Sequence, residues 1–257
     1  MKVTFLGTGT SYGVPFVACD CAVCRSADPF NKRLRCSILV EDEQTQLLVD
    51  TTPDLRQQML RAEVSSLSAI LWTHSHNDHI IGLDDIRPIS NRVGYLNGYG
   101  DGATIEDLER LFGYIFEQNR EYANFPRVTP HIIAPGDSLN FGRFRVTAFA
   151  LLHGKREILG YRFENGGRTF VYATDCSAIP EASWPHFADS DLTVLDALRH
   201  HEHPTHFNVA QALEVVEKTH PKRALFTHMA HDLDHQTTNS QLPKGVQLAF
   251  DGQVIEL

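Results

Sequence analysis

The sequence lacks a long apolar run, an excess of positive charge and an even number of cysteines. Even the apolar stretch LSAILWTHSHNDHIIGL at residues 67–83 is interrupted by charge and imidazole, well short of the roughly 18 apolar residues that a membrane span requires. The start, MKVTFLGTGT, also lacks the charged beginning and long apolar core of a signal peptide. We therefore expect a cytoplasmic protein with no membrane partner.

Charge and cysteine content narrow the expected partners further. Lys and Arg number 23 against 32 Asp and Glu, and the net charge of −9 opposes general electrostatic attraction to a polyanion. Small substrates are therefore expected, and nucleic acid is not. The five cysteines form an odd set in a chain of 257 residues, which is long enough to bury a core without disulfides. Metal binding or free thiols are favoured over disulfide bonds.

Short β-rich runs alternate with a few helices along the chain. Strands are expected at VTFL (3–6), CSILVE (36–41), QLLVD (46–50), SAILWT (68–73), RFRVTAFAL (143–151), RTFVYATD (168–175), LTVLDAL (192–198) and RALFTH (223–228). Helices are expected at 53–62, with Pro53 in the first turn, at 104–118, opened by TIED, and at 208–219, where Asn208 and Gln211 resemble a capping box. This arrangement predicts an α+β fold, a four-layer αββα sandwich.

Two hairpins are also expected. GYRFENGGRTFVYA should turn at residues 165–167 and VQLAFDGQVIEL at 251–252, because Asn, Asp and Gly accept the positive φ of tight turns. Residues 91–128, rich in Gly, Tyr and Phe, either border a substrate cleft or pack their aromatic rings into the core. Because no fixed-period repeat or evident linker occurs, we expect a single domain over residues 1–257.

The densest group of metal-ligand side chains follows the apolar run SAILWT. His74, His76, Asp78 and His79 fall within six positions directly after this predicted strand, which is unusual for a solvated polar loop. Their spacing lets His74 and His76 turn to one metal, and Asp78 and His79 to a second metal beside it.

Later strand ends supply further ligand types, namely His153 after FALL, Asp175 after VYAT and His228 after ALFT. Each alone is weak evidence, but together and in this order they are strong. The whole pattern resembles the metallo-β-lactamase superfamily, whose members use a binuclear metal centre at the edge of an αββα sandwich. The resemblance runs from GTGTSYG to the final residues and so covers essentially the whole chain.

The resemblance implies a role for each ligand. It places the first metal on His74, His76 and His153, the second on Asp78, His79 and His228, and Asp175 between them as the bridge. It makes Asp50 an orienting partner and not a ligand. A water or hydroxide between two cations has a strongly lowered pKa, and the carboxylate of Asp78 suits such a catalytic centre, so hydrolysis is the expected reaction. Manganese, zinc and iron all suit imidazole and carboxylate ligands.

The segment VACDCAVC at residues 17–24 is a second candidate metal site. Cys19, Cys21 and Cys24 are spaced so that three thiolates can face one ion, and a structural zinc normally has four protein ligands. With His228 assigned to the second catalytic metal, the sequence THMAH leaves His231 free to complete a Cys3His site. We therefore expect a zinc-binding loop near residues 17–25 and one structural zinc.

The combination of CDCAVC, HSHNDH and THMAH is similar to the phosphoribosyl cyclic phosphodiesterase family of the carbon-phosphorus lyase pathway. This resemblance implies a further catalytic histidine, which corresponds to His206 in PTHFNVAQAL. Because His206 directly precedes a helix N-terminus, where amide dipoles favour anions, it is placed to meet a phosphate or to protonate a leaving oxygen. A homodimer is compatible with the resemblance, although no heptad pattern or exposed apolar stripe predicts it.

The leading expectation is a binuclear metal-dependent phosphodiesterase that hydrolyses a small, cyclic phosphate ester, similar to phosphoribosyl 1,2-cyclic phosphate, through a metal-bridging hydroxide. A tRNA 3′-processing endonuclease is one alternative, against which the charge of −9 argues. Another is a non-catalytic accessory protein resembling pyrroloquinoline quinone biosynthesis protein B, against which the complete ligand set argues. Several residues have no assigned role at this point: Asp84, Asp85, Arg87, His200, His201, His203 and His235.

Overall fold

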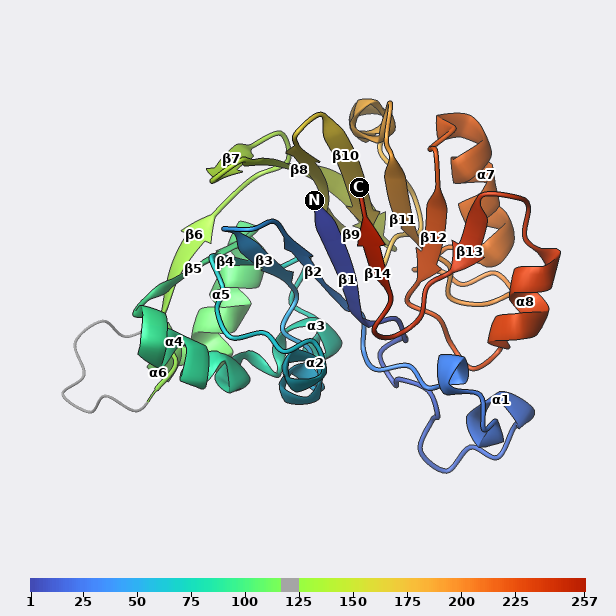
Figure 1. Ribbon diagram of the computed structural model, residues 1–257, viewed down its shortest axis with the longest axis horizontal. Helices are drawn as coiled ribbons and strands as arrows, with labels where there is room; N and C mark the ends of the chain where they lie inside the picture. The colour runs from blue at the N-terminus through green and yellow to red at the C-terminus, as the bar shows by residue number, and fades with distance from the viewer. Residues whose placement is uncertain (117–124) are drawn as a thin grey trace.

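The computed structural model describes residues 1–116 and 125–257 and shows two mixed sheets packed face to face (Figure 1). The first sheet contains, in spatial order, β14 (Val254–Glu256), β1 (Lys2–Gly7), β2 (Ser37–Glu41), β3 (Gln46–Val49), β4 (Ala69–Leu71), β5 (Leu96–Gly100) and β6 (Val128–Ile132). The second contains β13 (Val246–Leu248), β12 (Ala224–Thr227), β11 (Leu192–Asp196), β10 (Arg168–Ala173), β9 (Arg156–Asn165), β8 (Phe144–His153) and β7 (Ser138–Phe141).

Helices cover the outer face of each sheet (Figure 1). The first sheet is covered by α2 (Leu55–Arg61), α3 (Asn77–Ile80), η2 (Leu83–Ile86), α4 (Arg87–Val93), α5 (Gly102–Leu111) and α6 (Gly113–Phe116). The second is covered by η3 (Glu181–Phe187), α7 (Val209–Thr219) and α8 (His235–Gln241). The short helices α1 (Ala22–Arg25) and η1 (Pro29–Asn31) lie in the connection between β1 and β2. The four-layer αββα sandwich is confirmed.

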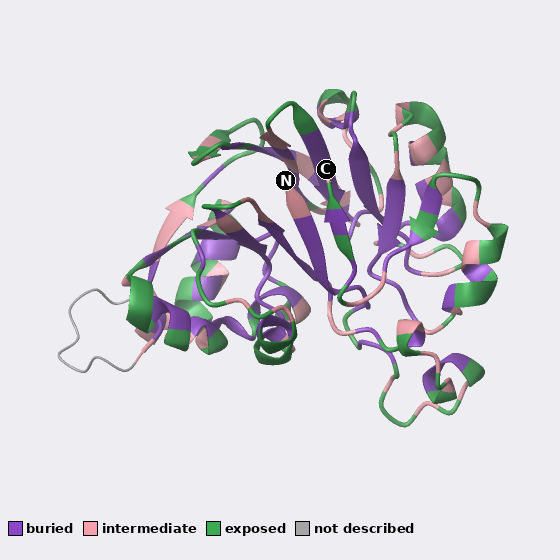
Figure 2. Cartoon of the chain, viewed as in Figure 1, coloured by how far each residue is buried: buried purple, intermediate pink, exposed green. Residues whose placement is uncertain are grey.

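The central strands are apolar at consecutive positions because both of their faces are covered. Ile38 and Val40 of β2 face the core between the two sheets, whereas Leu39 faces the helices outside. Since successive strand residues point to opposite faces, a strand between two apolar layers needs no polar alternation. Figure 2 shows the result as strands that are buried along most of their length, with exposure concentrated on helices and loops. Each fully buried aliphatic side chain contributes about 1.5–3 kcal/mol.

One predicted hairpin is confirmed and the other is wrong. Strands β9 and β10 pair antiparallel, with Asn165 opposite Arg168. Strand β13, however, pairs in parallel with β12 in the second sheet, and β14 pairs with β1 in the first. The turn at Asp251 and Gly252 therefore carries the chain from one sheet to the other, with a φ of 87° at Gly252. Turn chemistry predicts a change of direction but does not identify the partners of the flanking strands.

The helix predicted at 208–219 is confirmed together with its capping box. The Asn208 side chain accepts a hydrogen bond from the Gln211 backbone at 2.8 Å, and the Gln211 side chain accepts one from the Asn208 backbone at 3.0 Å. These reciprocal bonds satisfy two of the amide groups that a helix start leaves free.

The other two helices have different bounds from those predicted. Helix α2 begins after its N-cap residue Asp54, so Pro53 lies outside the first turn. Helix α5 begins at Gly102, because the Asp101 side chain accepts a hydrogen bond from the Thr104 backbone. It ends at Leu111, a second short helix follows, and the predicted positions 117–118 lie outside the described residues.

The described part of the 91–128 segment packs into the core. Ile105, Leu108, Phe112 and Ile115 are buried against the outer face of the first sheet. Of the two roles considered for this segment, core packing is the one these residues fill. Within the described residues, no helix has both the length and the hydropathy that crossing a membrane would need.

Candidate metal centres

The predicted catalytic ligands gather at one edge of the sandwich, where strands of both sheets end. His74, His153, Asp175 and His228 lie at or just beyond the ends of β4, β8, β10 and β12. Asp175 and His228 have φ values of 54° and 58°, and Asp50 beside them has 65°. Residues other than glycine rarely adopt this left-handed conformation, and strain of this kind is concentrated at functional sites.

The structure brings the first predicted set together. Ligand atoms of His74, His76 and His153 all lie within 4.8 Å of one another. His74 Nε2 is 3.0 Å from His76 Nδ1. His153 Nδ1 donates to the Thr205 carbonyl at 2.8 Å, so its Nε2 is the nitrogen left for a ligand bond.

The second predicted set is equally compact. Ligand atoms of Asp78, His79, Asp175 and His228 lie within 4.8 Å of one another. The Asp175 Oδ2 atom is 3.3 Å from His79 Nε2 and 3.1 Å from His228 Nε2. The same oxygen is 4.0 Å from His74 Nε2, which belongs to the first set. Asp175 therefore stands between the two sets, in the position that a bridging ligand would take.

The donor atoms fit two divalent metal ions. The buried Nε2 atoms of His79 and His228 make no hydrogen bond within the described residues, although carboxylate oxygens lie near both. An orphaned buried nitrogen of this kind is explained by an ion, and mixed imidazole and carboxylate donors suit divalent transition metals. The other ring nitrogen of His79, Nδ1, lies 2.8 Å from Asp50 Oδ2. Asp50 thereby fixes the orientation of the ring, which is the usual role of a carboxylate behind a metal-binding histidine.

The charge states of this edge are set by burial and by close charge pairs. Burial lowers the pKa of His74 well below its usual value. Burial also disfavours the charged form of Asp175, but His228 and His79 outweigh it and hold the pKa of this carboxyl well below its usual value. Burial likewise opposes protonation of His79, yet the carboxylates of Asp175, Asp78 and Asp50 raise its pKa well above the usual value. To hold a metal ion through Nε2, His79 would have to lose this proton.

His206 lies beside both sets. Its ring centroid is 4.7 Å from that of His153 and 4.7 Å from that of His228. His206 Nδ1 donates to Asp196 Oδ2 at 2.7 Å, which leaves Nε2 for other contacts. A ligand atom of His206 also lies within 4.8 Å of those of His153 and Asp175, so this ring can reach a metal or a metal-bound substrate.

Asp196 is a site residue that the sequence reasoning missed. It ends β11, is fully buried, and its Oδ1 atom lies 4.0 Å from His228 Nδ1. It therefore faces both His206 and a predicted metal ligand. A signal was present, because LTVLD ends on an aspartate in the same way as QLLVD, whose Asp50 the resemblance identified.

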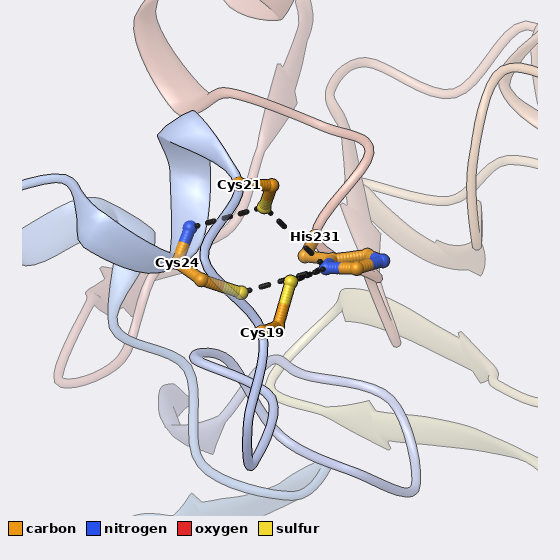
Figure 3. Close-up of side chains that lie close together, drawn as sticks. All are labelled: Cys19, Cys21, Cys24 and His231. Atoms are coloured by element: carbon orange, nitrogen blue, oxygen red, sulfur yellow. Dashed lines mark hydrogen bonds between the residues drawn. The ribbon is translucent and has the colours of Figure 1, made fainter.

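The cysteine segment and His231 form a separate cluster, shown in Figure 3. The Sγ atoms of Cys19, Cys21 and Cys24 lie 3.2, 3.5 and 3.4 Å from His231 Nδ1. All four ligand atoms lie within 4.8 Å of one another, as expected for one tetrahedral ion with bonds of about 2.0–2.3 Å. Three thiolates and one imidazole fit a structural zinc.

Neighbouring groups hold this cluster in place. The Cys24 backbone amide donates to Cys21 Sγ at 3.4 Å, and the pKa of the Cys21 thiol is lowered chiefly by this bond. Phe16 stacks on the His231 ring with centroids 4.0 Å apart. The buried Arg33 guanidinium donates to the Ala230 carbonyl at 2.9 Å and so ties the start of the chain to the residue before His231.

Three of the residues without an assigned role lie on the helical layer of the first sheet. Asp84 pairs with Arg87 and accepts a hydrogen bond from the Tyr114 hydroxyl at 2.9 Å, while Asp85 is exposed. Together with α2 they line a cavity of about 440 Å³, whose lining includes none of the predicted metal ligands. We assign them no part in the metal centres.

The remaining histidines divide by position. His235 is buried and stacks on Phe30 with centroids 4.9 Å apart, which is a packing role, whereas His200 and His201 are exposed. His203 differs from these, because its ring centroid lies 5.1 Å from that of His206.

A second cavity, of about 200 Å³, opens beside His206. One wall comes from Tyr12 and Phe16, which precede the cysteine segment, and the other from the loop that carries Arg199 and His203. His206 itself lines this cavity, whereas none of the predicted ligands of the binuclear site does.

Comparison with known proteins identifies the family and the fold. A family model described as "Beta-lactamase superfamily domain" matches residues 45–229. The solved structure of a diphosphatase from the PhnP family is 41% identical, with a TM-score of 0.91, over 100% of this chain and 97% of the other. The fold is also that of zinc-bound PqqB from Methylobacterium extorquens, at 20% identity and a TM-score of 0.86 over 100% of both chains.

A curated relative is longer than this chain. An octanoyltransferase from Porphyromonas gingivalis is 32% identical over 255 residues, which cover 98% of this chain but 51% of that protein. This chain spans about half the length of the curated relatives it matches.

Proposed function

The chain belongs to the β-lactamase superfamily and has the fold of its metallo-hydrolases, and from this premise we propose that it is a phosphodiesterase dependent on two divalent metals. Its substrate in this proposal is a small phosphate ester, of which a cyclic ester similar to phosphoribosyl 1,2-cyclic phosphate is the leading case. The 41% identical neighbour carries the name diphosphatase, so a phosphoanhydride bond is included among the substrates to be tested.

The position of His206 carries the proposal. It lies against both candidate metal sets but belongs to neither of the ligand sets implied by the superfamily resemblance. Its Nδ1 is occupied by Asp196, so the neutral ring has an unprotonated Nε2 and the protonated ring donates a proton from that atom. A group able to deliver a proton beside a metal pair suits the departure of an alkoxide from phosphorus.

Three aspartates of the edge, Asp50, Asp175 and Asp196, would orient the histidine rings and supply negative charge between the two metal sets. When bound, two divalent cations would supply a water of lowered pKa as nucleophile and would neutralise charge on the phosphoryl oxygens. Asp175 sets the separation of the two sets, and Asp50 fixes the His79 ring through its Nδ1. Asp196 holds His206 in one tautomer, so that Nε2 faces the reacting phosphate and delivers the proton to the leaving oxygen.

The test is metal analysis of protein purified without chelator, followed by a substrate screen. The protein, reloaded separately with manganese, zinc or iron, is assayed on cyclic and linear phosphodiesters, on a diphosphate, on a phosphomonoester and on precursor tRNA. We expect turnover of small diesters or of the diphosphate and none of the tRNA. Absence of phosphodiester and diphosphate hydrolysis with every metal would refute the proposal. Cleavage of the tRNA alone would instead support the alternative that the protein is a tRNA 3′-processing endonuclease.

We also propose that Cys19, Cys21, Cys24 and His231 hold one structural zinc. The support is the convergence of three sulfur atoms on a single imidazole nitrogen at 3.2–3.5 Å. A zinc there would join the cysteine segment to the loop that follows β12, and its binding energy would add to the stability of the fold.

A further inference from the structure

The first predicted ligand set is tied together by a chain of hydrogen bonds that the proposed reaction does not use. Ser75 lies between the ligands His74 and His76, and its hydroxyl contacts residues of two other elements. We propose that Arg156 and Asp107 position the first set through the Ser75 hydroxyl, and that the second set does not depend on them. This inference rests on the two-metal centre of the proposed function and adds three positioning residues to it.

The hydrogen bonds of this chain have a definite direction. Arg156 Nη2 donates to Ser75 Oγ at 2.9 Å, and Ser75 Oγ donates its single hydrogen to Asp107 Oδ2. Arg110 Nη2 donates to the other oxygen of the same carboxylate, Asp107 Oδ1, at 2.6 Å. Because a guanidinium and a carboxylate stand at its two ends, both bonds to the hydroxyl belong to the stronger, charge-assisted class. The buried Ser75 is thus held from two sides.

The elements that the chain joins carry all three ligands of the first set. Arg156 is the residue opposite His153 in the antiparallel pair of β8 and β9. Asp107 lies on α5, on the outer face of the first sheet. The Ser75 hydroxyl therefore connects the loop after β4 to the hairpin of β8 and β9, and these two segments come from different sheets.

His76 lacks the kind of support that His79 has. The ring of His79 is oriented by Asp50 behind its Nδ1 atom. His76 is exposed, its Nδ1 atom faces His74, and within the described residues no hydrogen bond holds its Nε2 atom. Because nothing behind the ring fixes it, its direction depends on the backbone that carries it. That backbone follows directly on Ser75, so a fixed Ser75 gives the ligand a fixed starting point.

The second set is held by other contacts. Asp78 and His79 lie on α3, where the His79 carbonyl accepts a hydrogen bond from the Thr51 backbone amide at 2.7 Å. His228 comes from the end of β12, in the other sheet. Loss of the Ser75 chain should therefore weaken metal binding at the first set and spare the second, and this asymmetry can be measured.

The experiment measures the two sets separately. Cobalt-loaded protein is titrated with a chelator, and the visible absorption of the bound cobalt gives one dissociation constant for each set. His76→Ala identifies the constant of the first set. We expect Ser75→Ala and Arg156→Gln to weaken this affinity by at least about 10-fold, the loss typical of an outer partner, and to leave the other within about threefold. Arg156→Lys, which keeps a charged donor, should lose less.

Ser190→Ala is the matched control. Ser190 is also buried, and its hydroxyl is hydrogen-bonded to the Thr193 hydroxyl at 2.7 Å, at the end of β11 away from the metal edge. Removing this hydroxyl should lower the thermal stability much as Ser75→Ala does, because each loses a buried hydrogen bond, but it should leave both cobalt constants unchanged. A merely structural serine at position 75 would behave in the same way, so selective weakening of one constant is what supports positioning.

The outcomes also separate this inference from the proposed function. Equal weakening of both constants in Ser75→Ala, no weakening, or the same effect in Ser190→Ala would refute the positioning role. The readout needs no substrate, so its result is the same whether or not the protein hydrolyses a phosphodiester. Failure of the wild type to bind cobalt at the edge would overturn both the inference and the two-metal centre.

Discussion

The two candidate metal centres share one short segment but are built in different ways. His228 and His231 both belong to THMAH, and they lie in different clusters. The cysteine cluster takes three of its ligands from one segment of the chain, and Cys19 and Cys21 remain partly exposed. The histidine and aspartate edge takes its ligands from the ends of strands in both sheets, and most of them are buried.

This difference indicates what each centre depends on. The cysteine cluster takes three ligands from one loop, so its assembly depends little on the rest of the fold. A zinc bound there would hold this loop against His231, the fourth ligand. The histidine and aspartate edge needs both sheets in register, because Asp175 reaches predicted ligands from each. The two centres should therefore be separable by mutation.

The largest effect is expected from Asp175→Asn. The amide keeps the shape of the side chain but removes the negative charge between the two sets, so both catalytic metals should be lost or weakened. Turnover should fall at least about 10³-fold, more than the 10- to 100-fold typical of an outer partner. Metal content by mass spectrometry and kcat measure this.

The zinc of the cysteine cluster serves as the internal control for Asp175→Asn. It should remain at one per chain, because none of its ligands contacts Asp175. Loss of all metal from a protein that stays folded would show that the two centres are coupled.

His206→Ala should come next. Removing the proton donor while leaving both ligand sets intact should lower kcat by about 10²- to 10⁴-fold at unchanged metal content. His200→Ala, at an exposed histidine of the same loop, is the control and should keep wild-type turnover. Unchanged kcat in His206→Ala would exclude the histidine from the reaction.

Asp196→Asn should have a smaller effect. The amide can still accept a hydrogen bond from His206 Nδ1 but cannot stabilise the protonated ring as a carboxylate does. We expect a 10- to 100-fold loss in kcat with KM little changed. A large rise in KM with constant kcat would instead place Asp196 in substrate binding.

The smallest effect on turnover is expected from Cys19→Ser. The variant should lose one zinc per chain and unfold about 6–12 °C lower, the shift that a loss of about 3 kcal/mol produces in a chain of this size. Turnover of the folded protein should stay within about tenfold. Cys36→Ala, at a buried cysteine outside the cluster, should keep the zinc count, and equal zinc loss in both variants would contradict the assignment.

The sequence predicted the sandwich and the grouping of the ligands because these depend on local patterns and on a resemblance that orders them. HSHNDH is compact enough to be recognised alone, whereas His153 and Asp175 were identified through their order along the chain. Asp196 was missed although LTVLD ends on an aspartate in the same way as QLLVD, because the resemblance assigned a role to Asp50 and none to Asp196. Its importance depends on the ring of His206, which arrives from a separate loop.

The errors in the fold have a similar cause. The residues Asp251 and Gly252 predict a turn, which the structure contains, but the sheets to which the flanking strands belong depend on tertiary pairing. Helix α5 begins at Gly102 and not at the predicted residue 104, because the Asp101 side chain accepts a hydrogen bond from the Thr104 backbone amide. The sequence TIED resembles a helix start and begins only at Thr104, so it suggested the later position.

The left-handed backbone at Asp50, Asp175 and His228 has a consequence for the metal-free protein. Residues forced into this conformation cost roughly 1 kcal/mol or more each, and surrounding bonds must supply that energy. Cations held by Asp175 and His228 would offset part of this cost, so without them we expect the turns after β10 and β12 to open more readily than in the loaded protein. Chelation should therefore accelerate amide hydrogen exchange in these two turns more than in the strand interiors, and equal acceleration in both would contradict this expectation.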